Sequence, residues 1–315
     1  MSEDRWARIA ESGTWRALRF VGWSHRTFGR GPSVTLLWLA AAYFLVRSGT
    51  TRRASQRYLG RVWATPEGRR ALRRRPGLAA SLRHLHAFAV ALYDRLVVWS
   101  GELDSLAVGH DGSEKIFGVA RAGKGALLLG AHLGSIDMLW FLSRKYQLTV
   151  NVIGYHGNAE RINAFLESFA PGERVRMIDM DPNSVYAAFE IKACIERGEF
   201  VVMLADRVAP GKTARTGEAG FLGHPARFPL GPFLLAGVLE CPVLFALCVC
   251  TGPARYDTVL RPIGDAARVP RGEREKRAKE LLERYAALLE STCTRLPFQW
   301  FNFYDFWGDD AETRP

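Results

Sequence analysis

Apolar segments of about six residues alternate with longer segments of helical pattern from about residue 115 onward, and this alternation is the strongest constraint on the fold. Strands separated by helices of about 10–15 residues predict an α/β fold with a mostly parallel central sheet and helices on both faces. The expected strands are 126–131, 148–155, 175–180, 200–205 and 243–250, with 257–262 beside the last. The expected helices are 135–146, 159–170, 184–197, 230–240 and 271–294. In such sheets, functional sites form at the carboxyl ends of the strands.

The first quarter of the chain carries almost all of its net charge of +11. Residues 1–80 contain sixteen arginines, no lysine and four acidic residues, in a helical pattern that glycines and prolines interrupt at Gly31-Pro32, Pro66–Gly68 and Pro76-Gly77. We therefore expect a helical, Arg- and Trp-rich, membrane-associating region over residues 1–100, followed by an α/β domain over residues 101–315. Such a basic block attracts an anionic membrane surface or an acidic carrier protein. No nucleic-acid-binding motif accompanies it, so nucleic acid is not an expected partner.

A short apolar segment inside this region, Val34–Val46, is the best membrane candidate. It has 13 residues between Arg30 and Arg47, whereas a spanning helix needs roughly 20. The segment could span a membrane, lie in the interface or be buried in the protein. Tryptophans in the same Arg-rich region, among them Trp6, Trp15, Trp23 and Trp38, favour the interfacial interpretation, because Trp prefers the head-group layer.

A histidine and an aspartate interrupt the apolar run LLLGAHLGSIDMLWF. His132 follows the first expected strand, Gly134 and Ser135 form a turn, and Asp137 begins the next expected helix. Across such a corner, the carboxylate could hold one imidazole nitrogen and leave the other as a base. The alternative is a helix-capping aspartate beside an unrelated histidine.

A second group of polar residues follows another expected strand. Asp206 and Arg207 stand at the strand end, and a loop of about twenty residues with several glycines and cations precedes FLGHPARFP. A loop of that length is often functional, and Lys and Arg suit an anionic group. Asp206 and Arg207 could instead form a structural ion pair.

Several kinds of chemistry are not expected. The five cysteines have no CxxC spacing and no His-Cys cluster, which indicates small core thiols in a reducing compartment. The residues predict neither a metal site nor a cofactor. A serine-hydrolase G-x-S-x-G elbow is absent, and no G-x-G-x-x-G opens a helix after a strand.

The order of these motifs along the chain resembles the lipid A biosynthesis acyltransferase family of the glycerolipid acyltransferase superfamily. The resemblance rests on His132-x4-Asp137, ADR, FLGHPARFPLGPFLLA, CPV and the closing LPFQWFNFYDFW, together with ESGTW and RRASQRYLGRV near the start. Many members carry Glu at the position of Asp137. The aromatic tail looks more like the subgroup found with aryl-polyene pathways, which leaves the acceptor open.

This resemblance implies transfer of a fatty acyl group from an acyl-carrier-protein or coenzyme A thioester to a hydroxyl of a glycolipid or lipid-linked acceptor. His132 would be the base and Asp137 its orienting carboxylate. Arg207, Asp206, Gly134 and Gly223 are candidates for oxyanion or substrate binding, and Arg161 and Asn163 would contact acceptor or carrier. It also implies a location on the cytoplasmic face of the bacterial inner membrane. A thioesterase or other hydrolase using the same His-Asp pair is the alternative.

Overall fold

The computed structural model describes most of the chain. The described residues are 23–25, 27–99, 106–109, 113–135, 138, 147–154, 175–179, 185–208, 215–265 and 269–308.

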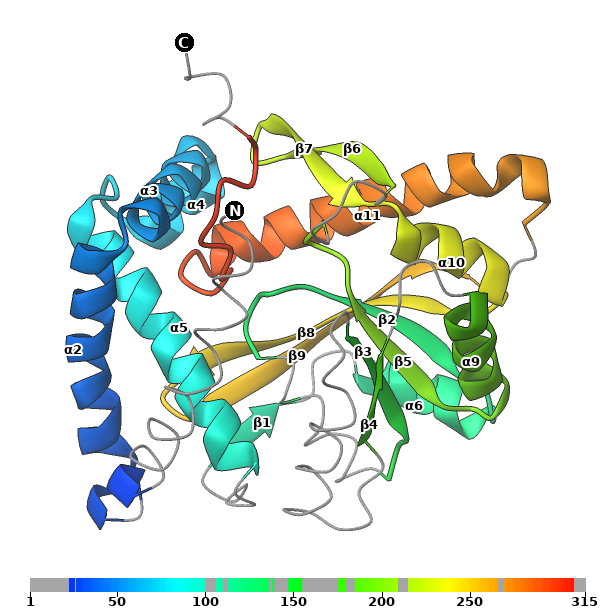
Figure 1. Cartoon of the computed structure of the whole chain (residues 1–315), viewed down its shortest axis with the longest axis horizontal. Coiled ribbons are helices and arrows are strands. Elements are labelled where there is room, and N and C mark those ends of the chain that lie inside the picture. Colours follow the sequence, from blue (N-terminus) through cyan, green and yellow to red (C-terminus); the bar gives the residue numbers. More distant parts are fainter. Residues whose placement is uncertain are drawn as a thin grey trace.

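Seven described strands form one sheet in the order β1-β9-β8-β2-β5-β3-β4 (Figure 1). Their bounds are Ala107–Gly109 (β1), Ala126–Gly130 (β2), Val150–Gly154 (β3), Val175–Asp179 (β4), Phe200–Leu204 (β5), Val243–Gly252 (β8) and Arg255–Gly264 (β9). The five strands from β8 to β4 are parallel, whereas β9 runs antiparallel to β8. The predicted mostly parallel sheet is therefore confirmed, as is the pairing of the 257–262 strand beside the 243–250 strand.

The central strands are apolar throughout because both faces of the sheet are covered. Leu127 and Leu129 of β2 belong to one core cluster, and Ala126 and Leu128 belong to another on the opposite face. Continuous apolar runs of this kind are typical of parallel strands that are buried on both sides.

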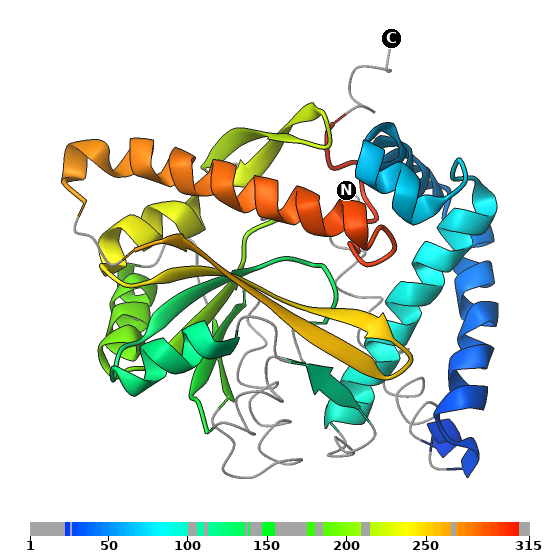
Figure 2. The ribbon, with the colours of Figure 1, turned by 180° about the vertical axis from the view of Figure 1, so that it is seen from behind.

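Among the described helices, α9 (Val185–Glu196), α10 (Gly231–Leu239) and α11 (Arg274–Arg295) pack on the first face and α6 (Ser113–Arg121) packs on the second (Figures 1 and 2). The positions predicted for α9, α10 and α11 agree with these bounds to within three residues.

The segment expected to be a long loop after Asp206 contains a β-hairpin, which corrects the prediction from residue 215 onward. Strands β6 (Thr216–Phe221) and β7 (His224–Pro229) pair antiparallel through a turn at Leu222 and Gly223. Every second residue of β6 is buried, as in a strand with one face on the core. Its small residues and the prolines of β7 concealed this alternation, because glycine and proline are rare within strands.

The described helices before the sheet include α2 (Arg30–Arg47), α3 (Gly49–Ala64), α4 (Pro66–Leu72) and α5 (Leu78–Trp99). Breaks before Pro66 and Leu78 were expected, but Pro32 lies in the first turn of α2, a position that tolerates proline. Tyr58, Leu59 and Val62 of α3 belong to the same core cluster as the sheet. The division into two regions at residue 100 stays a prediction.

A buried ion pair attaches α2 to α5 and to the sheet. Two hydrogen bonds of 2.8 and 2.9 Å run from Arg30 Nη2 to the carboxylate of Asp94, which is fully buried. The Tyr256 hydroxyl on β9 donates a further hydrogen bond of 2.7 Å to Asp94. Burial raises the pKa of Asp94, and the positive charge of Arg30 and the bond from Tyr256 oppose that rise. The Asp94 carboxylate thus links α2, α5 and β9, which are distant from one another in sequence.

No described helix is by itself both long and apolar enough to cross a membrane. The helices α2 and α3 meet those criteria only when they are taken together, and the two are bent by 100° relative to each other.

Candidate active site

Two neighbouring parallel strands bring His132 and Asp206 together. Strands β2 and β5 pair in register, with Gly130 opposite Leu204, and each site residue stands two positions after its strand. The His132 Nδ1 atom lies 2.8 Å from Asp206 Oδ1, and the backbone N–H of His132 donates to Asp206 Oδ2 at 3.0 Å. The Asp206 carboxylate therefore binds His132 at two points: Oδ1 contacts the imidazole ring, and Oδ2 accepts from the backbone N–H.

The Asp206 carboxylate is fully buried and is held ionised by its neighbours. Burial alone would raise its pKa, but the His132 imidazole, the hydrogen bonds that His132 donates and the Arg207 charge outweigh it and hold the pKa below its usual value. Asp206 Oδ2 also accepts from Trp300 Nε1 at 2.9 Å and from Asn302 Nδ2 at 3.1 Å. Because an ionised carboxylate can only accept, the proton of neutral His132 resides on Nδ1, and Nε2 keeps its lone pair.

The prediction for Asp137 was that it would orient His132. Asp137 lies outside the described residues, so its part in the site stays a prediction. Asp137 was expected to hold one imidazole nitrogen of His132, and one of the two, Nδ1, is bonded to Asp206. Asp206 itself was expected to contact substrate, but complete burial and two occupied oxygens favour an orienting role instead.

A glycine makes the corner behind His132 possible. Gly134 has a φ of 71°, and a Cβ there would lie 2.1 Å from the carbonyl oxygen of Cys248 on β8. The Gly134 N–H donates to the Gln299 carbonyl at 2.9 Å, and the Ser135 N–H donates to the Cys248 carbonyl at 2.8 Å. Since the Gly134 N–H is already bonded, the role of oxyanion donor expected for Gly134 does not fit, and the glycine serves close backbone approach.

Arg207 does not pair with the aspartate beside it. Its Nε donates to Asn302 Oδ1, and its Nη2 donates to the Phe301 carbonyl at 2.7 Å. The remaining nitrogen, Nη1, has no acceptor among the described residues, and the side chain is half-buried. Arg207 thus keeps a fixed positive charge with one pair of N–H donors available beside the His132–Asp206 pair.

Gly223, another predicted site residue, makes no contact with the pair. Gly223 forms the exposed turn of the β6–β7 hairpin with a φ of 78°, and a Cβ there would meet nothing within 4 Å. The hairpin approaches the site through Phe221, whose ring packs on Trp300 at 5.2 Å. The turn therefore explains Gly223 better than oxyanion binding does. Arg161 and Asn163 lie outside the described residues.

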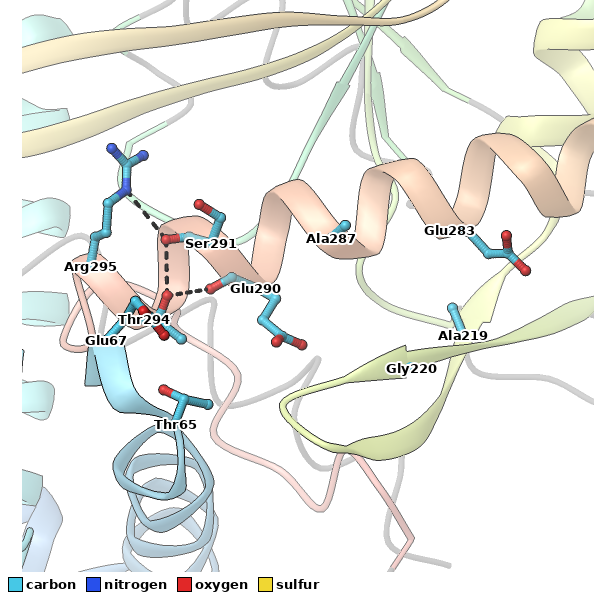
Figure 3. Close-up of a pocket in the computed structure, with 10 residues that line it drawn as sticks. All are labelled: Thr65, Glu67, Ala219, Gly220, Glu283, Ala287, Glu290, Ser291, Thr294 and Arg295. Atoms are coloured by element: carbon cyan, nitrogen blue, oxygen red, sulfur yellow. Dashed lines mark hydrogen bonds between the residues drawn. The ribbon is translucent and has the colours of Figure 1, made fainter. Parts of the chain in front are cut away.

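A surface pocket of about 460 Å³ lies away from this pair, between α4, the hairpin and the last turns of α11 (Figure 3). Glu67, Glu283 and Glu290 are among the residues that line it. Glu290 Oε2 also accepts a hydrogen bond from the Leu222 N–H and so holds the hairpin turn. An acidic lining is unsuited to a fatty acyl chain, so this pocket is not a candidate for the substrate.

Sequence reasoning missed the contribution of the closing segment, residues 296–308, to the site. Trp300 and Asn302 of that segment donate to Asp206, and the Phe301 N–H donates to the His132 carbonyl at 2.7 Å. The available signal is the closing motif LPFQWFNFYDFW, which contributes to the family resemblance but by itself predicts no role in the site.

A buried histidine supports the closing segment from behind. His84 of α5 is fully buried, with Nε2 2.8 Å from the Trp300 carbonyl and Nδ1 3.0 Å from Ser55 Oγ. Since the carbonyl only accepts, Nε2 carries the proton and Nδ1 accepts from Ser55. Burial lowers the pKa of His84 to about 4, against the bond to Trp300, which raises it.

This lowered pKa predicts a loss of stability in mild acid. Below pH 6.5 the unfolded chain binds a proton at His84 that the folded protein refuses until about pH 4. The contribution is complete above pH 6.5 and disappears as the pH falls toward 4, a change of about 3 kcal/mol. Urea unfolding of the wild type and of His84→Gln, which retains a donor for Trp300, measures it. Parallel stability curves between pH 7 and 4 would contradict the expectation.

These features describe an α/β protein with a histidine, backed by a buried carboxylate, at the carboxyl edge of its sheet, which is where such folds place their functional sites. Residues 84–308 match the model of the bacterial lipid A biosynthesis acyltransferase family. The match covers more than half of the chain, and the protein belongs to that family. No curated protein matched the chain.

Proposed function

We propose that the protein is a membrane-associated O-acyltransferase. It moves a fatty acyl chain from an acyl-carrier-protein or coenzyme A thioester to a hydroxyl of a glycolipid or lipid-linked acceptor, of the lipid A or the aryl-polyene type. The observation that carries the proposal is the bond between His132 Nδ1 and Asp206, which leaves Nε2 as a base. Family membership supports the reaction class.

The proposed chemistry is a single transfer with His132 as general base. His132 Nε2 takes the proton of the acceptor hydroxyl as its oxygen attacks the thioester carbonyl carbon. Asp206 stabilises the imidazolium that forms. The tetrahedral intermediate collapses, the C–S bond breaks, and the imidazolium returns the proton to the thiolate. General-base assistance of this kind typically contributes about 10²–10⁴-fold to the rate.

The oxyanion of the intermediate requires donors, and Arg207 is the proposed source. Its Nη1 is the guanidinium nitrogen that no described residue occupies, and the other two nitrogens are anchored to the closing segment. A donor fixed in this way can stabilise developing charge without reorganising during the reaction.

The experiment that tests this function uses a radiolabelled acyl-carrier thioester, with and without a lipid acceptor. Transfer of label to lipid that depends on the acceptor supports the proposal. Release of free fatty acid at the same rate with and without acceptor would identify a hydrolase instead. Mass spectrometry of membrane lipids from cells with and without the active protein then names the acceptor through a mass increase of one acyl chain.

The membrane association is proposed from one exposed face of α2. Leu36, Leu39, Tyr43 and Val46 recur at helical spacing and are 45–79% exposed. Residues 30–66 contain no acidic residue, and Arg47 and Arg53 are exposed near the end of this face. An apolar stripe with flanking cations suits a helix that lies in the interface of an anionic membrane. We propose the cytoplasmic face of the inner membrane as that surface.

Replacing Leu39 by aspartate is therefore expected to weaken membrane binding at least about tenfold, because burial of a leucine contributes about 1.5–3 kcal/mol. Co-sedimentation with vesicles of phosphatidylglycerol and phosphatidylethanolamine measures this. Val238→Asp is the matched control, since Val238 is 40% exposed on α10, at the other end of the molecule from α2 (Figure 1). Equal loss of binding in both variants, or in neither, would contradict the assignment of α2.

A further inference from the structure

Three N–H groups converge on one oxygen of the buried Asp206 carboxylate. Oδ2 accepts from the His132 backbone, from Trp300 Nε1 and from Asn302 Nδ2, at 3.0, 2.9 and 3.1 Å. Among the described residues, Oδ1 accepts only from His132 Nδ1. The closing segment thus supplies two of the four described donors to a carboxylate that has no solvent contact.

The backbone of the closing segment is fixed to the same corner of the chain. Trp300 forms an isolated antiparallel β-bridge with Leu133. Two backbone hydrogen bonds flank this bridge: Phe301 N–H donates to the His132 carbonyl at 2.7 Å, and Gly134 N–H donates to the Gln299 carbonyl at 2.9 Å. The Gln299 side chain bonds both the N–H and the carbonyl of Cys250, at 2.8 and 2.6 Å. A shift of this segment would therefore move His132 and Asp206 together.

Asn302 contacts both charged residues that follow β5. Its Nδ2 donates to Asp206 Oδ2, and its Oδ1 accepts from Arg207 Nε. The two partners fix the orientation of the amide, because a carboxylate only accepts and a guanidinium only donates. The Asn302 amide thus lies between the Asp206 carboxylate and the Arg207 guanidinium, which do not contact each other. Asp206 Oδ1 is bonded to His132 instead.

We propose that Trp300 and Asn302 are positioning residues for the His132 base. They act through Asp206: they stabilise its ionised form and set the proton affinity of the His132–Asp206 pair. This inference rests on the proposed function for its catalytic meaning, although the hydrogen bonds themselves do not depend on it.

The direction of the effect follows from the charge of the pair. The pair carries one negative charge when His132 is neutral and no net charge once it has bound a proton. Hydrogen-bond donors to the Asp206 carboxylate stabilise the negatively charged state of the pair more strongly than the neutral one. Removing one donor therefore destabilises the deprotonated pair relative to the protonated pair, whichever residue takes the proton. The apparent pKa of the pair rises, by about one unit for one charge-assisted hydrogen bond.

Other groups that face Asp206 stay in one charge state while the pair titrates. Tyr285 and Cys293 on α11 and Tyr304 in the closing segment have pKa values raised by burial, so they remain neutral. Arg207 remains positive, and His84 titrates only near pH 4. A shift observed above pH 5 thus reports the pair itself.

The test follows His132 by histidine-selective ¹³C NMR over pH 5–9 in the full-length protein. Trp300→Phe keeps an aromatic ring against Tyr58 and Phe221 but removes the donor. Asn302→Leu has a similar shape and no hydrogen bonds, so it provides a second answer if the first variant does not fold. Phe303→Leu is the control. Phe303 belongs to the same closing segment, but its ring packs on Phe88 of α5 and it has no hydrogen bond to Asp206.

We expect both donor variants to raise the pKa of His132 by about one unit, with the control unchanged, and the acid limb of the kcat/KM profile to move by the same amount. Folded donor variants in which His132 titrates as in the wild type would overturn the positioning role, even if acyl transfer is intact. A shifted titration in a protein that transfers no acyl group would support the positioning role and overturn the proposed function.

Discussion

Replacement of Asp206 by asparagine is expected to lower kcat for acyl transfer by about 10²–10⁴-fold without unfolding the protein. The amide has one oxygen, and three N–H donors converge on the position of Oδ2. The amide NH₂ then faces His132 Nδ1, which must accept rather than donate. The imidazole proton moves to Nε2, and the base loses the lone pair that the mechanism requires.

Steady-state rates with acyl thioester and lipid acceptor measure this effect. Asp305→Asn is the matched control, because Asp305 is an aspartate of the closing segment that forms a partly exposed ion pair with Arg57 at 3.5 Å. We expect its rate to stay within about twofold of the wild type, in keeping with the small contribution of such pairs. An Asp206→Asn rate within tenfold of the wild type would contradict Asp206 as the orienting carboxylate, and Asp137 would then be the residue to replace.

Replacement of Gly134 by alanine is expected to reduce both stability and rate. A left-handed φ costs a residue with a Cβ about 1–2 kcal/mol, and relief of the 2.1 Å approach to the Cys248 carbonyl adds about 1–3 kcal/mol. The movement also displaces His132, which lies two residues away. A displacement of about 1 Å can lower a rate by about 10²-fold.

Gly223→Ala provides the comparison for this prediction. Gly223 has nearly the same φ as Gly134, but a Cβ there would meet open space. Its cost should therefore be that of the backbone conformation alone, with the rate unchanged. Denaturant unfolding and acyl-transfer rates of the two variants separate the cost of the left-handed backbone conformation from the cost of the close approach to the Cys248 carbonyl. Equal losses in both variants would show that the close approach to Cys248 contributes nothing.

The sequence could place His132 and Asp206 at the same edge of the sheet but could not pair them. Both follow apolar strands, and the carboxyl ends of parallel strands meet at one edge. Which strands are neighbours was not readable, because β2 lies between β5 and β8 and not beside β3, the next strand along the chain. The sequence therefore predicts the nearest carboxylate, Asp137, as the partner, whereas the bonded one, Asp206, stands 74 positions after His132.

The role of the closing segment is a tertiary property that local sequence does not contain. Its aromatic residues carry the family resemblance and predict no contact with the site, whereas in the structure Trp300 is fully buried. Only the packing of α11 against the sheet brings the Trp300 indole N–H to Asp206. By contrast, the periodic apolar patterns of the central strands and of α11 were sufficient, because burial on one or both faces determines them directly.

The activity of His132→Gln decides whether His132 is the base of an acyl transfer. The amount of radiolabelled acyl chain moved from acyl-carrier thioester to lipid acceptor is compared between this variant and the wild type, at pH 7.5. We expect transfer by the wild type and a rate at least about 10²-fold lower in the variant. Transfer by His132→Gln at the wild-type rate would contradict this role of His132.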